Sequence, residues 1–167
     1  MNPPMNITVW SEDNFIFGVI YMEEKQIKVL KVAPLEKLEV CYLENELSSL
    51  QKAVSIGADY VGLIEIIDLD EKACILCNEE GKLIRLMPNR QVENDIICGV
   101  FYVTGQDKAG NLTALTNEQI QYYTATFSRI EYFLRSNDGE IIVLRFIWKK
   151  NTRKSFILFL VFFCMIL

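Results

Sequence analysis

The stretch "CNEEGKLIRLMPNR", residues 77–90, places a polar turn between two apolar runs and ends in Pro-Asn-Arg. The run before the turn is "KACILC" (72–77), and the run after it is "KLIRLM" (82–87). Asn favours the entry to a turn, two glutamates keep the tip in water, and Gly81 can adopt the left-handed conformation that closes a type I turn with a bulge. The stretch therefore predicts a β-hairpin over residues 72–87.

Apolar runs on both sides of this hairpin predict further strands. "QIKVLKV" (26–32) alternates polar and apolar residues, which is typical of a half-buried strand. "DIICGVFYV" (95–103) is continuously apolar after its first residue, which indicates a strand buried on both faces. The other expected strands are residues 7–10, 15–22, 38–43, 60–67 and 140–148.

Two helices are expected. Residues 45–54 carry apolar side chains at helical spacing, with Asn45 as the N-cap. The second helix begins at Thr116, and Gln119 is its capping-box partner. Its apolar stripe consists of Ile120, Tyr123, Phe127, Ile130 and Leu134. Strands and helices without strict alternation predict an α+β fold: a small mixed or antiparallel sheet with two helices packed on it, plus N- and C-terminal extensions.

The length of 167 residues suits one compact domain with extensions. We expect a β-rich N-terminal extension over residues 1–25, an α+β core domain over 26–136, and a basic, then apolar, C-terminal tail over 137–167. Residues 26–127 carry fifteen acids and nine bases, so their net charge is −6, whereas the whole chain has −5. An acidic body argues against direct nucleic-acid binding there, because phosphate binding needs clustered Lys or Arg.

The chain contains no histidine. This excludes His-dependent catalytic triads and mixed His/Cys zinc sites. The N-terminus lacks the pattern of a secretory signal, so we expect a cytoplasmic protein with reduced cysteines. We expect no catalytic residues, no metal and no cofactor.

The tail has a basic segment, residues 149–154, followed by twelve apolar residues, 156–167. As a helix, twelve residues would rise about 18 Å, which is too short for the roughly 30 Å hydrocarbon core of a bilayer. Three interpretations remain open. The tail packs on the domain or on a partner, it contacts a membrane beside its basic collar, or it is a truncated or frame-altered end.

Cys74 and Cys77 form a C-x-x-C pair, a spacing found in zinc and redox sites. On a strand, residues three apart point to opposite faces, so their sulfurs diverge. A four-cysteine site would also have to recruit Cys41 and Cys98. The pattern favours buried structural cysteines.

Asn89 and Arg90 follow a proline that fixes the backbone. Asp95 could accept the Arg90 guanidinium in a bidentate ion pair that holds the loop in place. The alternative is a small ligand-binding site, in which Asn89, Arg90 and Asp95 bind a phosphate or carboxylate.

The middle of the chain, about residues 26–127, resembles a family of small bacterial domains catalogued as domain of unknown function 3846. The matching segments are "IKVLKVAP", "LENELSSLQKAV", "CNEEGKLIRLMPNR", "DIICGVFYVTG" and "LTNEQIQYY". The chain departs from the family at "VSIGADYVG" (54–62) and beyond about residue 130. The positions that match the family's pattern form a candidate interaction or ligand patch: Asn78, Glu79, Gly81, Asn89, Arg90, Asp95 and Gly99.

The resemblance implies carriage on plasmids, conjugative elements or phages, and it implies no established activity. We therefore expect a non-enzymatic accessory or protein-interaction module whose partner is a host protein or one encoded by the element. An acidic surface suits a basic partner, because complementary fields speed association and select partners. The alternatives are the small ligand-binding domain described above and a peripheral membrane protein that uses residues 156–167.

Overall fold

The computed structural model of the protein describes residues 25–57, 60–138, 141–145 and 164–165. The predicted strands at 7–10 and 15–22 lie outside the described residues, as does most of the apolar segment 156–167. Among the described residues, no helix is both long enough and apolar enough to cross a membrane.

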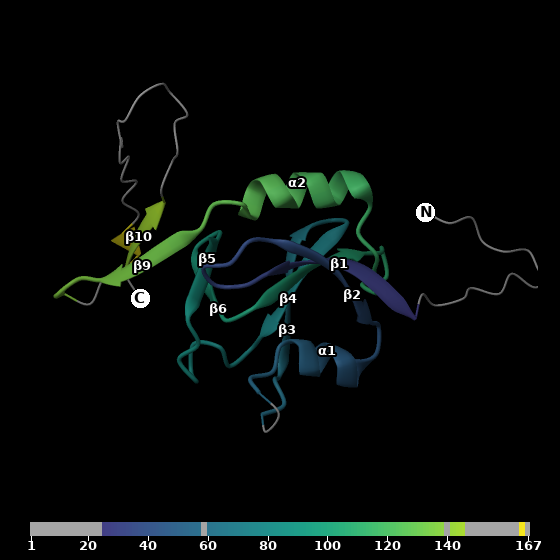
Figure 1. Cartoon of the computed structure of the whole chain (residues 1–167), viewed down its shortest axis with the longest axis horizontal. Helices are drawn as coiled ribbons and strands as arrows, with labels where there is room; N and C mark the ends of the chain where they lie inside the picture. Colours follow the sequence, from purple (N-terminus) through teal and green to yellow (C-terminus); the bar gives the residue numbers. More distant parts are fainter. Residues whose placement is uncertain (1–24, 58–59, 139–140, 146–163, 166–167) are drawn as a thin grey trace, which may run out of the picture.

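A six-stranded antiparallel sheet forms the body of the protein (Figure 1). Its strand order is β2-β1-β7-β4-β3, and β8 pairs with β7 outside this path. The predicted α+β class is confirmed, with more sheet than helix, and the sheet is antiparallel. The strands are β1 (Gln26–Val32), β2 (Glu39–Glu44), β3 (Ile64–Asp70), β4 (Ala73–Asn78), β7 (Phe101–Gln106) and β8 (Leu112–Thr113).

The side chains of β1 alternate between two buried clusters. Ile27 and Val29 belong to one cluster, and Leu30 and Val32 belong to the other. This is the consequence of the two-residue side-chain period of a strand. The central strands β4 and β7 are buried along almost their whole length, because both of their faces contribute to these clusters.

The helices α1 (Leu47–Ala53) and α2 (Asn117–Phe127) lie on opposite sides of the sheet in Figure 1. Leu50 of α1 joins the cluster that contains Ile27. Phe127 of α2 joins the cluster that contains Leu30, and its ring meets that of Phe101 edge to face at 5.4 Å. Such aromatic pairs add to the stabilisation from buried area.

Two smaller sheets adjoin the body. One is a hairpin of two strands, and the other has three strands in the order β11-β10-β9. The expected domain boundary at residue 136 falls in the connection between β9 and β10, which pair with each other. The strands are β5 (Pro88–Val92), β6 (Asp95–Cys98), β9 (Glu131–Arg135), β10 (Ile141–Arg145) and β11 (Cys164–Met165).

The predicted hairpin over residues 72–87 is wrong in its second strand. Residues 79–85 form consecutive turns and residues 86–87 are irregular, held by the bonds Ile84 N–Glu80 O (2.9 Å) and Leu86 N–Gly81 O (2.8 Å). The strand β4 pairs with β3 on one side and with β7 on the other, so it has no edge left for residues 82–87. The hairpin partner of β4 is β3, the strand before it.

The predicted strand over 95–103 consists of two strands. It divides at Gly99, which has φ +85°, a conformation that favours glycine. β6 pairs with β5 before this corner, and β7 enters the large sheet after it. Continuous apolar sequence could not show this division, because both strands are buried.

The second helix ends at Phe127, so the predicted continuation through Leu134 is wrong. The Phe127 carbonyl accepts a hydrogen bond from Arg90 Nε (3.2 Å). Residues 131–135 pair with β10 instead of extending the helix. The start of the helix is confirmed: Thr116 and Gln119 form the capping box.

The predicted N-cap of α1 is also wrong. The cap residue is Glu46, whose side chain makes no capping hydrogen bond. Asn45 instead donates from Nδ2 to the Leu112 carbonyl (3.2 Å) and so contacts β8. The strand that follows α1, β3, begins at Ile64, whereas we expected it to begin at residue 60.

Candidate functional site

The family-pattern residues surround the turns at 79–85 and the β5–β6 hairpin. Asn78 lies at the end of β4 and is buried. Its Nδ2 donates to the Val54 carbonyl (3.0 Å), and its Oδ1 accepts from the Glu80 amide (2.9 Å). The predicted turn entry at Asn78 is confirmed, and both ends of its side-chain amide are bonded to the main chain.

The two glycines of this motif lie where backbone segments approach closely. A Cβ on Gly81 would come within 2.7 Å of the Cys98 carbonyl oxygen, and a Cβ on Gly99 within 2.5 Å of Leu86 Cδ1. Gly81 does not have a positive φ, so the predicted left-handed turn is wrong there; in this loop Arg85 has φ 59°. Glycine is therefore required at position 81 because there is no space for a Cβ atom.

Asn89 is fully buried and joins three parts of the fold. Its Nδ2 donates to the Val32 carbonyl of β1 (2.8 Å) and to the Gly99 carbonyl (2.7 Å). Its Oδ1 accepts from Arg90 Nη1 (2.9 Å). The Asn89 amide therefore ties the β5–β6 hairpin to the large sheet.

Arg90 is only 2% exposed. Its Nη1 also donates to the Asn89 carbonyl (2.9 Å), and its Nε donates to the Phe127 carbonyl. Burial lowers the pKa of Arg90 from its ordinary value, and the charge of Glu131 acts in the opposite direction. Among the described residues, Arg90 Nη2 is buried without a hydrogen-bond partner.

The predicted Arg90–Asp95 ion pair is wrong. Asp95 is exposed and pairs with Lys82, and its Oδ1 also accepts from the Ile96 amide (2.7 Å). Arg90 instead lies inside the protein, where carbonyl groups bind it. Arg90 and Asp95, which we expected to act together, therefore lie in different environments. Glu79 is the other member of the motif that is exposed at the surface.

A partly buried charge network next to Arg90 was missed from the sequence. Glu131 on β9 is only slightly exposed; it accepts from the Gln91 amide (2.6 Å) and pairs with Arg145 Nε (2.5 Å). Arg145 Nη2 also donates to Gln91 Oε1 (3.1 Å). The network joins β5, β9 and β10, and no local pattern could indicate it, because its members lie up to 54 residues apart.

The two cysteines of the C-x-x-C pair lie on opposite faces of β4, as predicted. Cys77 belongs to the cluster with Phe101, whereas Cys74 contacts the Thr104 hydroxyl (3.2 Å). Burial, and after it the charge and hydrogen bond of the nearby Glu65, raise the pKa of the Cys77 thiol to about 12. Cys77 is therefore a protonated thiol at neutral pH. In the described part of the chain, no group of Cys, Asp and Glu is arranged to hold a metal ion.

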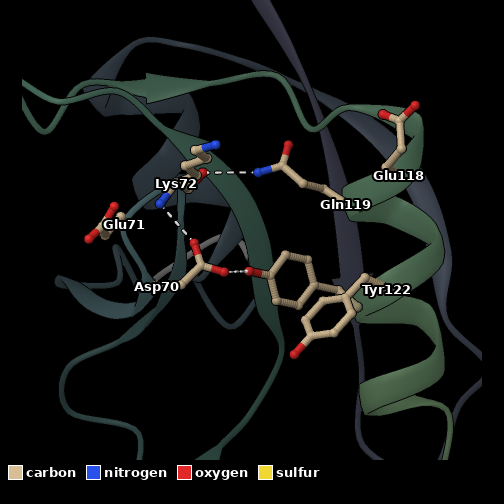
Figure 2. A pocket seen from close by; sticks show the side chains of 7 residues that line it. Asp70, Glu71, Lys72, Glu118, Gln119 and Tyr122 are labelled. Carbon is tan, nitrogen blue, oxygen red and sulfur yellow. Dashed lines mark hydrogen bonds between the residues drawn. The ribbon is translucent and has the colours of Figure 1, made fainter.

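A surface depression of about 450 Å³ lies between the β3–β4 turn and the first turns of α2. Figure 2 shows its hydrogen-bonded centre, where Gln119 Nε2 donates to the Lys72 carbonyl (3.0 Å) and Tyr123 donates to Asp70. Around this centre, Glu71 and Glu118 point outward on either side, and Tyr122 is 65% exposed. We call Asp70, Glu71, Glu118 and Tyr122 the acidic surface.

Hydrogen bonds favour the charged form of two members of this surface, Asp70 and Glu118. The hydrogen bond from Tyr123 lowers the pKa of Asp70, and the amide of Lys72 adds to this effect. Hydrogen bonds from its own amide and from the Thr116 side chain lower the pKa of Glu118. Burial, then the bond to Asp70, raises the pKa of Tyr123. The sequence did not single out this surface, because its members come from two distant segments.

The family model described as "Domain of unknown function (DUF3846)" matches residues 27–128. The chain belongs to this family. Comparisons with curated proteins and with solved structures gave no match. The matched segment of this DUF3846 protein runs from β1 through α2, and it contains every residue of the family-pattern motif.

Proposed function

We propose that this DUF3846 domain is a non-enzymatic, cytoplasmic protein-interaction module that recruits a basic partner, as an accessory of a plasmid, conjugative element or phage. The genetic setting and the choice of a host or element-encoded partner rest on the family resemblance. The binding surface is the acidic surface. The observation that carries the proposal is the outward orientation of Glu71, Glu118 and Tyr122 around a shallow depression.

The chemistry of this surface suits lysine or arginine side chains. Two carboxylates attract a cation, and an exposed tyrosine ring can stack against it in a cation–π contact. The depression is open and its central polar groups already bond to one another, so it fits a protein surface better than an enclosed small molecule. Lys72 is the one cation among its lining residues.

The buried members of the family-pattern motif support a non-enzymatic role. Asn78, Asn89 and Arg90 direct their hydrogen bonds to main-chain carbonyls and to each other. A ligand site at Asn89 and Arg90 is less well supported, since Arg90 is buried and Asp95 pairs elsewhere. The alternative of membrane contact by residues 156–167 concerns a segment that lies almost wholly outside the described residues.

The test is binding of a fluorescent lysine-rich peptide to the full chain, followed by anisotropy at low and moderate salt. We expect binding that weakens as salt rises, because it is electrostatic. The double substitution Glu71→Gln, Glu118→Gln should weaken it at least tenfold, and Tyr122→Ser should weaken it further.

The matched control is Glu79→Gln, Glu93→Gln, which removes the same charge from exposed positions elsewhere. It should leave the affinity nearly unchanged. Equal losses in the two double variants would mean that net charge alone attracts the peptide, and the proposal would then fail. A larger loss of affinity in the control variant than in the Glu71→Gln, Glu118→Gln variant would place the binding surface at the Glu79 turn.

A further inference from the structure

The two edges of the large sheet differ in how well they are protected. β3 and β2 are the terminal strands of the sheet order. β3 carries Glu65, Asp68 and Asp70, and its pairing with β4 is irregular between Asp68 and Asp70. Charges and bulges are the devices that keep an edge strand from pairing with another chain. β3 is thus a protected edge.

β2 lacks this protection. It pairs with β1 in one unbroken register from Glu39 to Glu44, and its centre, "VCYL" (40–43), is uncharged. Val40 is 46% exposed and Tyr42 65% exposed. A strand at a sheet edge presents unpaired amide and carbonyl groups along its outer side. In the described part of the chain, no strand pairs with this outer side of β2.

From this contrast we propose that β2 is a docking edge that accepts an extended segment of a protein partner as a further strand. The inference rests on the proposed role as an interaction module for a basic partner, but it concerns a surface other than the acidic one. In this mode, main-chain hydrogen bonds supply affinity, and alternate side chains supply specificity.

The charges on β2 define the occupant. Its uncharged centre is bounded by Glu39 and Glu44, one at each end. The complementary segment has a lysine or arginine at each end of four uncharged residues, because opposite charges on adjacent strands stabilise pairing and like charges oppose it. Apolar or aromatic residues in its centre would pack against Val40 and Tyr42.

The same argument disfavours two other occupants. A second copy of β2, paired antiparallel over its full length, would put Glu39 directly opposite Glu44. The chain's own apolar run at 15–22 has Glu12 and Asp13 before it and Glu23 and Glu24 after it, so acidic residues would again approach the acidic ends of β2. A basic partner avoids both conflicts.

The experiment uses the full chain and a labelled peptide whose core is Lys-Thr-Val-Thr-Val-Lys, which in an antiparallel register places its valines opposite Tyr42 and Val40. In two versions of the peptide, alternate residues are N-methylated. Because successive amides of a strand point to opposite sides, each version lacks the amide donors of one side. We expect one version to bind with the affinity of the parent peptide and the other to bind at least tenfold more weakly, because only one side of the peptide faces β2. Equal binding of both versions would show that main-chain pairing is absent and would overturn the proposal.

Tyr42→Lys should abolish peptide binding through repulsion, whereas Ile66→Lys, a position on β3 with 51% exposure, should not change it. Hydrogen exchange of the amides of residues 40–43 should be fast on the outer side in the free protein and slow once peptide is bound. Slow exchange without peptide, or a dimer that Tyr42→Lys dissociates, would assign the edge to the chain itself and overturn the proposal.

Failure here is distinguishable from failure of the acidic surface. Glu71→Gln, Glu118→Gln should weaken only the lysine-rich peptide, and Tyr42→Lys should weaken only the strand-forming peptide. If the first peptide binds and the second does not, the β2 inference alone is wrong. If Glu71→Gln, Glu118→Gln weakens the binding of both peptides and Tyr42→Lys weakens neither, both peptides bind the acidic surface. The β2 edge then has no role.

Discussion

The hydroxyl of Tyr123 on α2 donates a hydrogen bond to the carboxylate of Asp70 at the end of β3. Tyr123 is otherwise buried in the cluster that underlies α2. The bond therefore fixes the position of the helix relative to the β3–β4 turn, and it shapes the centre of the acidic surface.

This bond predicts a specific pH dependence. The pKa of Asp70 is lower in the folded protein, so its contribution to stability is present above the unfolded pKa, which is about 3.9, and is lost as pH falls through the folded value. Tyr123→Phe should destabilise the protein at pH 7, and the difference from wild type should shrink under acidic conditions. Urea unfolding of both proteins at several pH values tests this, and a difference that stays constant below pH 4 would contradict it.

Arg90 and Asp95 should be energetically independent. Arg90→Ala should lower the free energy of unfolding by at least about 2 kcal/mol, because it leaves a cavity and unpaired buried carbonyls. Asp95→Ala should cost only about 0.2–1 kcal/mol, as for other exposed ion pairs. A double-mutant cycle on these two residues should give a coupling within about 0.5 kcal/mol. A larger coupling would restore the ion pair that the sequence suggested.

The glycines at 81 and 110 should respond differently to substitution. Gly81→Ala forces Cβ against the Cys98 carbonyl, and we expect a loss of about 1–3 kcal/mol. Gly110 has φ +84° and open space around it, so its requirement is conformational. Gly110→Asn should be tolerated, since Asn adopts this conformation more readily than Ala does. Thermal unfolding of the variants checks the ranking, and a tolerated Gly81→Ala would refute the steric explanation.

Cys77 should resist alkylation in the native protein. Its thiol is buried and its pKa is about 12, so very little reactive thiolate exists at neutral pH. Treatment with iodoacetamide, followed by peptide mass spectrometry, should label Cys77 only after a denaturant is added. The partly exposed Cys41 is the internal comparison. Native labelling of Cys77 at the rate of Cys41 would contradict its assignment as a structural residue.

The sequence predicted those elements whose signals are local. The alternation in β1 and the capping box at Thr116 and Gln119 both appear in the structure. So does the divergence of Cys74 and Cys77, because it follows from strand geometry alone.

The errors arose where distant residues decide the outcome. Residues 82–87 are apolar enough for a strand, but β3 and β7 already occupy both edges of β4. The helical stripe continues past Phe127, but the helix ends there; Arg90 binds the Phe127 carbonyl, and residues 131–135 pair with β10. The acidic surface and the Glu131 network depend on the same kind of long-range contact.

The amide of Asn89 has a consequence for how the protein folds. It binds Val32, which precedes it by 57 residues, so the β5–β6 hairpin cannot complete its hydrogen bonds before β1 is in place. Contacts that close long loops slow the folding of small domains, because the entropy of loop closure is lost before the contact forms. We expect this hairpin to form late, so that substitutions in it accelerate unfolding and leave the refolding rate almost unchanged.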